Sequence, residues 1–260
     1  LPCMAAGGLS LVSVIFAYFR LPESLPKSRR AKTDGLKWTS LIGKSLKQSY
    51  SMLNKGTISV IIWVTMLFIF GFTIMHAVFI LYTGMAVDSG GLGYNEAQNG
   101  RIFAIIGIAG ILTQGLLIGP LTRRFGSAKL LPVSCIITGL GLVLIPYTKA
   151  EWAFFQLFLV VGLIAIGNGI FQPTSSSLLT SVAKQEGVNL GIVMGAQESV
   201  SSFARIIGPL TGGVVWTYTV ANEWPLHYHT AFHLCGLIML FAAALALKVN
   251  RIKDNHFEES

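Results

Sequence analysis

Glu198 and Arg205 are the only charged residues in the long apolar segment 190–219. They stand seven residues apart, which on a helix puts both side chains on one face, about 10 Å apart along the axis. A charge in hydrocarbon is costly, so such residues usually face a polar cavity or a partner of opposite sign. Arg205 would attract an anionic substrate or a proton-carrying carboxylate, or it would pair with Glu198, and Glu198 is itself a candidate for proton exchange. The residues alone leave these roles open.

Four amide side chains inside apolar segments form a second group of candidate binding residues. An amide both donates and accepts hydrogen bonds, so it suits either a polar solute path or a bond between neighbouring helices. His76, in the segment 57–82, would contact an aromatic ligand or serve as a hydrogen-bonded packing residue. Both roles stay open for the four amides, which are Gln114, Asn168, Gln172 and Gln197.

The sequence contains none of the motifs that membrane enzymes use. H-E-x-x-H and G-x-S-x-G are absent, and no paired aspartates lie within an apolar segment. His76 has no second ligand at metal-binding spacing, and Cys3, Cys135 and Cys235 show no C-x-x-C spacing. We therefore expect no enzymatic activity, no cofactor and no metal site, and we expect the cysteines to be small buried hydrophobes.

The composition indicates the solvent in which these residues are positioned. Of the 260 residues, 53% are hydrophobic and 12% are charged, and the mean hydropathy is +0.65. A soluble domain carries about 25% charged residues, because it must cover its surface with them. Lipid is thus the expected surrounding, and the chain is expected to be an integral membrane protein.

Apolar segments that approach or exceed the roughly 20 residues needed to cross a bilayer divide the chain. Backbone polar groups in lipid must be satisfied within the segment, so the segments are predicted to be helices and the fold to be all-α. The seven predicted spans are 1–19, 57–82, 97–119, 130–148, 152–180, 190–219 and 230–248.

The basic residues alternate between the connections. Sixteen of the 19 Lys and Arg lie in residues 20–56, in the 120–129 and 181–189 loops and in the tail from Lys248, whereas the opposite loops hold only Lys149. Basic connections stay in the cytoplasm, so the carboxyl-terminal tail is predicted to be cytoplasmic. The net charge of +8 therefore indicates membrane orientation and no nucleic-acid partner.

The connection 20–56 is the only long one. Its lysines and serines alternate with apolar residues such as Trp38 and Leu46, which suggests a helix along the membrane surface. It separates the segment 1–19 from the six that follow. Because Leu1 begins inside an apolar run, we expect the chain to start at an interior point of a longer protein.

A motif in the loop 119–129 carries a family resemblance. Gly119-Pro-Leu-Thr-Arg-Arg-Phe-Gly126-Ser-Ala-Lys129 resembles the cytoplasmic motif G-x-x-x-D-R-x-G-x-[RK]-[RK] of the major facilitator superfamily. Gly119, Arg124, Gly126 and Lys129 match. Arg123 stands where the family has Asp, and Ala128 replaces a basic residue, which weakens the expectation of a charged cytoplasmic gate here.

Three further stretches resemble the drug:proton antiporter branch of that superfamily, which includes tetracycline-efflux proteins. Leu21-Pro-Glu-Ser24 is similar to the P-E-[ST] that follows the sixth helix in that branch. Two more segments of this chain resemble the tenth and eleventh helices of the same branch. They are Gly167-Asn-Gly-Ile-Phe-Gln-Pro173 and Ala204-Arg-Ile-Ile-Gly-Pro-Leu-Thr-Gly-Gly213.

The resemblance implies an organisation of the chain. Residues 1–19 would be the last helix of an N-terminal half, 20–56 a cytoplasmic central linker, 57–248 a C-terminal six-helix bundle and 249–260 a cytoplasmic tail. The seven spans would be the C-terminal half of a major facilitator fold plus one preceding helix. Transport would then require the N-terminal half or a second copy of the chain, because alternating access rocks one half against the other.

The resemblance also implies a function, namely a secondary active transporter that moves a small molecule by alternating access. Proton-coupled efflux of a drug or metabolite across the bacterial inner membrane is the expected form. Two alternatives remain from the residues: a signalling seven-helix membrane protein, which the absence of a Lys within the segment 230–247 disfavours for a retinal-type protein, and a non-transporting subunit.

Overall fold

A computed structural model describes residues 2–21, 47–148, 153–222 and 225–258, all of which form helices and short connections without a strand. The chain divides into two compact units, residues 1–43 and 44–260. Helix α1 (Pro2–Arg20) belongs to the first unit. The predicted surface helix falls mostly on residues 22–46, outside the described part of the chain, while residues 47–52 of the same connection are helical.

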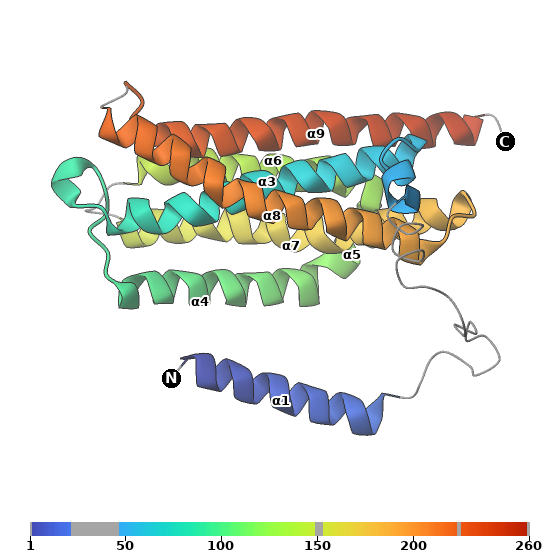
Figure 1. The fold of residues 1–260 in the computed structure, drawn as a ribbon, viewed down its shortest axis with the longest axis horizontal. Coiled ribbons are helices and arrows are strands. Elements are labelled where there is room, and N and C mark those ends of the chain that lie inside the picture. Colours follow the sequence, from blue (N-terminus) through green and yellow to red (C-terminus); the bar gives the residue numbers. More distant parts are fainter. Residues whose placement is uncertain (1, 22–46, 149–152, 223–224, 259–260) are drawn as a thin grey trace. The chain divides into compact units, whose positions relative to one another are not determined.

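The second unit is a bundle of long helices (Figure 1). A π-helical turn, Thr113–Leu117, joins α4 to α5. A 3-10 turn, Ile145–Tyr147, directly follows α6. The long elements are α3 (Gly56–Gly84), α4 (Glu96–Leu112), α5 (Ile118–Phe125), α6 (Ser127–Leu144), α7 (Ala153–Gln185), α8 (Leu190–Ala221) and α9 (His229–Glu258).

Each predicted apolar segment coincides with a helix. Five stretches of the described chain are long and apolar enough to cross a membrane: Gly56–Gly84, Glu96–Phe125, Ser127–Tyr147, Phe155–Gln185 and His229–Val249. Helix α8 is as long as these but contains Glu198 and Arg205, and α1 is shorter. Their crossing of the bilayer stays a prediction.

Helix α9 is longer than its apolar part. The apolar stretch His229–Val249 ends close to the predicted end of the last span, 230–248, and the helix itself continues through the predicted tail 249–260 to Glu258. The backbone has no reason to stop at Lys248, because the following residues contain neither Gly nor Pro and a helix tolerates the change from apolar to charged side chains.

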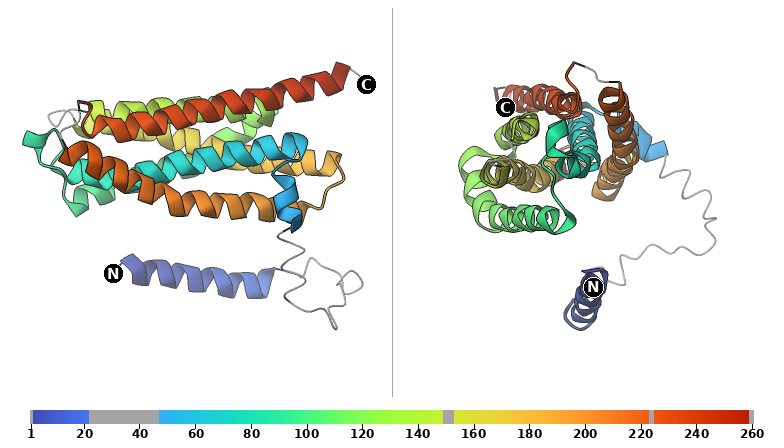
Figure 2. Two further views of the ribbon diagram at one scale, coloured as in Figure 1. Left: turned by 45° about the horizontal axis from the view of Figure 1, so that its top comes forward. Right: turned by 90° about the vertical axis from the view of Figure 1, so that its left-hand side faces the viewer.

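The helices pack in a repeated pattern (Figure 2). Helix α3 packs along α8 and α9, α7 packs along α4 and α6, and α6 packs along α9. This set of contacts is unchanged when α3, α4 and α6 are exchanged with α7, α8 and α9. The bundle therefore has the symmetry of two three-helix repeats, which run in opposite directions because each connection reverses the chain.

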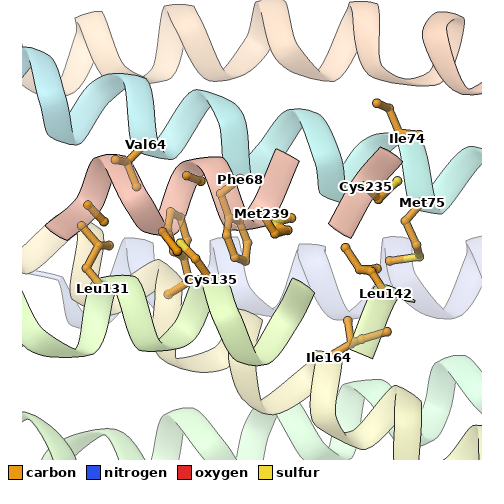
Figure 3. Packing of buried hydrophobic residues seen from close by; sticks show 14 of the residues in the cluster. Val64, Phe68, Ile74, Met75, Leu131, Cys135, Leu142, Ile164, Cys235 and Met239 are labelled. Atoms are coloured by element: carbon orange, nitrogen blue, oxygen red, sulfur yellow. The ribbon is translucent and has the colours of Figure 1, made fainter. Parts of the chain in front are cut away.

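The core lies where α3, α6, α7 and α9 meet (Figure 3). Phe68 of α3 stacks on Phe171 of α7 with ring centroids 3.6 Å apart. Small residues let the helices approach closely: a Cβ on Gly139 of α6 would meet the Cβ of Met239 of α9 at 2.9 Å. Such packing replaces the hydrophobic effect, which does not drive helices together in lipid.

The three cysteines are free thiols, as expected, but their burial differs. Cys135 of α6 and Cys235 of α9 are fully buried in the core, which confirms their role as small hydrophobes. The same expectation was wrong for Cys3, which is exposed on α1.

Candidate functional site

Contacts between helices bring four of the predicted site residues to a common depth in the bundle. Gly169 of α7 packs against Thr113, whose sequence neighbour is Gln114. Phe171 stacks on Phe68 of α3. The Thr73 hydroxyl of α3 donates to the carbonyl of Ala204 of α8 at 3.4 Å.

At 1.5 Å per residue, the positions that these contacts link lie within about 10 Å of one another along the bundle. The depth is near the middle of each helix. We name the side chains there the polar layer, which consists of Gln114, Asn168, Gln172 and Arg205.

Arg205 and Glu198 contact each other along the surface of α8. The Arg205 Nη1 donates to the Glu198 Oε1 at 2.5 Å, as the shared helix face allows. The two side chains are 49% and 65% exposed, so the bundle does not bury the pair. The sequence left open whether Arg205 pairs with Glu198 or attracts a substrate. The structure contains the pair, and both side chains remain accessible to a ligand.

Two amide oxygens are buried without a hydrogen bond. The Asn168 Oδ1 and the Gln197 Oε1 have no partner among the residues that the structure describes. A buried acceptor without a donor is destabilising, and native proteins satisfy nearly all of them. These oxygens are therefore available to a donor that is not part of the described chain, such as water, a solute or another helix.

Gln114 and Gln172 are exposed, and each stands beside a local irregularity of its helix. Gln114 lies in the π-helical turn Thr113–Leu117, where the Ile118 N–H donates to the Thr113 carbonyl. Pro120 follows within α5 and has no N–H to give the preceding turn. Gln172 directly precedes Pro173 inside α7. Turns of the π type often occur at functional sites, so this turn makes the region around Gln114 a candidate.

A ladder of aromatic rings leads from the core to the surface of α3. Phe68, buried against Phe171, stacks on Phe72 at 6.0 Å, and the Phe72 ring meets the edge of the exposed His76 ring at 4.6 Å. His76 thus packs on Phe72 and still presents a ring to the surroundings. The residues 68, 72 and 76 share one face because they are spaced by four.

The basic motif forms the turn between α5 and α6. Gly126 has φ +75°, a conformation that favours glycine, and its N–H caps α5 by donating to the Thr122 carbonyl. Gly119, Arg123, Arg124 and Lys129 are exposed, and the Arg124 guanidinium lies 5.4 Å from the Phe125 ring centroid. Neither Arg123 nor Arg124 forms an ion pair within the described ranges.

The sequence interpretation missed a hydroxyl-rich strip on α7. Ser176, Ser177, Thr180 and Ser181 line a shallow surface groove together with Lys184. The run of Ser and Thr over 174–181 was the available signal, since adjacent polar residues inside a membrane segment need a polar neighbour. Its spacing places most of these hydroxyls on the accessible side of the helix.

Comparison with known proteins identifies relatives along the whole chain. A family model of the Major Facilitator Superfamily matches residues 2–209 and also residues 115–259. Multidrug resistance protein 2 of Bacillus subtilis is 25% identical over 247 residues, which cover 95% of this chain and 56% of that protein.

Two further relatives match part of the chain. The class C tetracycline resistance protein of Escherichia coli is 24% identical over 59% of the chain and 35% of its own length. Solute carrier family 22 member 18 of Rattus norvegicus is 28% identical over 60% of the chain and 37% of its own length. The chain thus spans about half or less of the curated relatives that it matches.

Proposed function

The chain belongs to the Major Facilitator Superfamily, and from this we propose that it supplies most of the C-terminal half of a secondary active transporter that exports a drug-like small molecule or metabolite in exchange for protons. It is an integral membrane protein with relatives named for multidrug and tetracycline resistance. In the proposed orientation the protein lies in the bacterial inner membrane with its carboxyl terminus in the cytoplasm, because the basic connections are on that side.

The polar layer is the observation that carries this proposal. Three helical segments place hydrogen-bonding groups at one depth, an ion pair stays accessible on α8, and the amide oxygens of Asn168 in this layer and of Gln197 on α8 lack a donor. A purely structural bundle in lipid has no use for such groups, since each is costly to expose to hydrocarbon. A substrate path near the bilayer midplane would solvate them.

Substrate would bind between this bundle and a second six-helix half, contributed by the same polypeptide or by a second copy. Superfamily transporters hold substrate near the midplane between two halves that rock against each other. The exposed side chains of the polar layer would face that space. The Phe72 and His76 rings would add an apolar, aromatic wall suited to a drug-like ring system.

Glu198 and Arg205 are proposed to couple substrate to protons. With Glu198 ionised, the pair is closed as the structure has it. When Glu198 takes a proton, the guanidinium loses its partner and becomes free to hold an anionic group of the substrate or of the opposite half. A proton and the Arg205 guanidinium would thus compete for the Glu198 carboxylate, and this competition would link transport to the pH gradient.

Flux in membrane vesicles tests the proposal. The intact transporter would be reconstituted and presented with hydrophobic cations, tetracycline-like molecules and sugars, with and without an imposed pH gradient. The Glu198→Gln variant should lose gradient-driven flux while still binding substrate. Glu96→Gln, which changes an exposed carboxylate in the first turn of α4, is the matched control. Unchanged coupling in Glu198→Gln would remove Glu198 from the mechanism, and gradient-independent flux in the parent would exclude antiport.

A further inference from the structure

Three rings gather at the end of the bundle where α6 ends and α9 begins, away from the polar layer. Tyr147 closes the 3-10 turn after α6, and His229 and His233 lie one turn apart at the start of α9. The ring centroids are 5.2 Å apart for Tyr147 and His229, 5.8 Å for Tyr147 and His233, and 5.9 Å for the two histidines. The rings form a nearly equilateral triangle.

One side of this triangle is a hydrogen bond, and its third ring is held by stacking. The Tyr147 hydroxyl lies 3.0 Å from the His233 Nε2, so that nitrogen points toward the phenol and not into the bundle. His229 is held by Tyr228, whose ring stacks on it at 4.4 Å. Tyr228 packs in turn on the buried ring of Tyr82 of α3, at 5.2 Å. The two imidazoles are therefore positioned by their surroundings and are not free rotors.

The spacing suits a transition-metal ion. Two imidazoles that bind one ion through nitrogens at about 2.1 Å have ring centres roughly 5 to 6.5 Å apart, and histidines at positions i and i+4 of a helix form such pairs in metalloproteins. Imidazole nitrogen is a preferred ligand of divalent zinc and copper. No group of three or more His, Cys, Asp or Glu side chains within the described ranges is arranged for a metal, so a third ligand would have to be of another type.

We propose that His229, His233 and Tyr147 bind one divalent transition-metal ion, with water completing its coordination. The two imidazoles supply nitrogen and the Tyr147 oxygen moves from its hydrogen bond with His233 to the ion. Tyr147 is exposed and the histidines are half-buried, so the ion reaches the site from the surrounding solution. A bound ion would connect the end of α6 to the start of α9, two helices that occupy equivalent places in the two repeats.

Metal titration of the intact protein tests this site. The protein would be purified in detergent with a tag that contains no histidine, because a histidine tag would itself bind the ion. Calorimetric titration with Zn²⁺ should show one ion per chain with an affinity in the micromolar range. Electron paramagnetic resonance with Cu²⁺ should show two nitrogen ligands, and one in each histidine variant.

The variants separate ligands from neighbours. His229→Ala and His233→Gln should each weaken Zn²⁺ binding by roughly tenfold or more. His233→Gln retains a side chain that hydrogen-bonds Tyr147, so the loss cannot be attributed to a broken contact. Two control variants should bind Zn²⁺ as the parent does. They are His76→Ala on α3 and His227→Asn, and Asn is chosen at 227 because it tolerates the positive φ of that position.

Two results would overturn the proposal. Absence of saturable Zn²⁺ binding at millimolar concentration in the parent would exclude the site. Equal affinity in the parent and in both folded variants of His229 and His233 would place the ion elsewhere. An affinity that Tyr147→Phe leaves unchanged would contradict the part assigned to the phenol.

Discussion

The hydroxyl of Thr73 on α3 occupies the space that a side chain at Gly208 on α8 would need. Thr73 donates to the Ile69 carbonyl of its own helix at 2.8 Å and reaches the Ala204 carbonyl across the interface. Glycine at 208 therefore lets the backbones of α3 and α8 approach closely, and Gly212, one turn on, packs on the Ile74 carbonyl in the same way.

Substitution of Gly208 should loosen this interface. Gly208→Ala places a methyl group against Thr73 and the Phe70 carbonyl, so we expect a loss of about 1–3 kcal/mol of unfolding free energy. Thermal unfolding in detergent can be followed with a thiol-reactive dye, because Cys135 and Cys235 react only when the core opens and the exposed Cys3 gives a constant background. Gly213→Ala, next to open space, should unfold as the parent does. Equal stability of both variants would contradict the close packing.

The Glu198–Arg205 pair should contribute little to stability. Ion pairs as exposed as this one contribute about 0–1 kcal/mol, because solvent screens them and ordering two long side chains costs entropy. The double variant Glu198→Gln with Arg205→Gln should therefore unfold within about 1 kcal/mol of the parent but should not transport. A large loss of stability with intact transport would make the pair structural.

The orphaned amide of Asn168 should be dispensable for folding. Asn168→Leu removes a buried unsatisfied oxygen, so stability should be unchanged or raised by up to about 1 kcal/mol, while substrate flux falls. Thr65→Val is the contrasting variant, because the Thr65 and Ser175 hydroxyls are buried 2.7 Å apart and Ser175 would lose its partner. That variant should lose about 1–3 kcal/mol. A destabilised Asn168→Leu would indicate that the amide is bonded in the native state.

Gly169 should set the position of the π-helical turn. A Cβ at this position would lie 2.9 Å from the Cβ and the Cγ2 of Thr113, so Gly169→Ala should push α4 from α7 and displace Gln114. We expect reduced substrate affinity together with a loss of about 1–3 kcal/mol. Gly162→Ala, on the same helix beside open space, is the control and should retain both. Unaltered affinity in Gly169→Ala would separate Gln114 from the substrate path.

The sequence predicted the helices well and their contacts poorly. Apolar runs long enough to cross a bilayer are a signal confined to each segment, and all of the predicted segments proved helical, although α9 continues beyond its predicted end to Glu258. Helix pairing depends on single small residues, whose partners cannot be found from spacing. The G-x-x-x-G pair at 208 and 212 packs on α3, whereas those at 115 and 119 and at 191 and 195 meet no other helix in the described chain.

The candidate site was predicted in the same uneven way. A helical spacing of seven correctly anticipated that Glu198 and Arg205 share a face, because that relationship lies within one element. The common depth of Gln114, Asn168 and Arg205 depends on how three helices slide against one another, and the aromatic ladder depends on which ring meets Phe68. Neither relationship is encoded in a local pattern.

The segment that contains α4 is the least buried of the five apolar stretches. In its most apolar stretch, the segment Glu96–Phe125 has 11% of its residues buried, against 56% for α3, and α7 is its main neighbour. A bulky molecule that inserted beside α4 would need to separate mainly the contact between α4 and α7. The core formed by α3, α6, α7 and α9 would stay packed. The close approach of α8 to α3 at Gly208 and Gly212 would resist such a separation on the other side of the bundle.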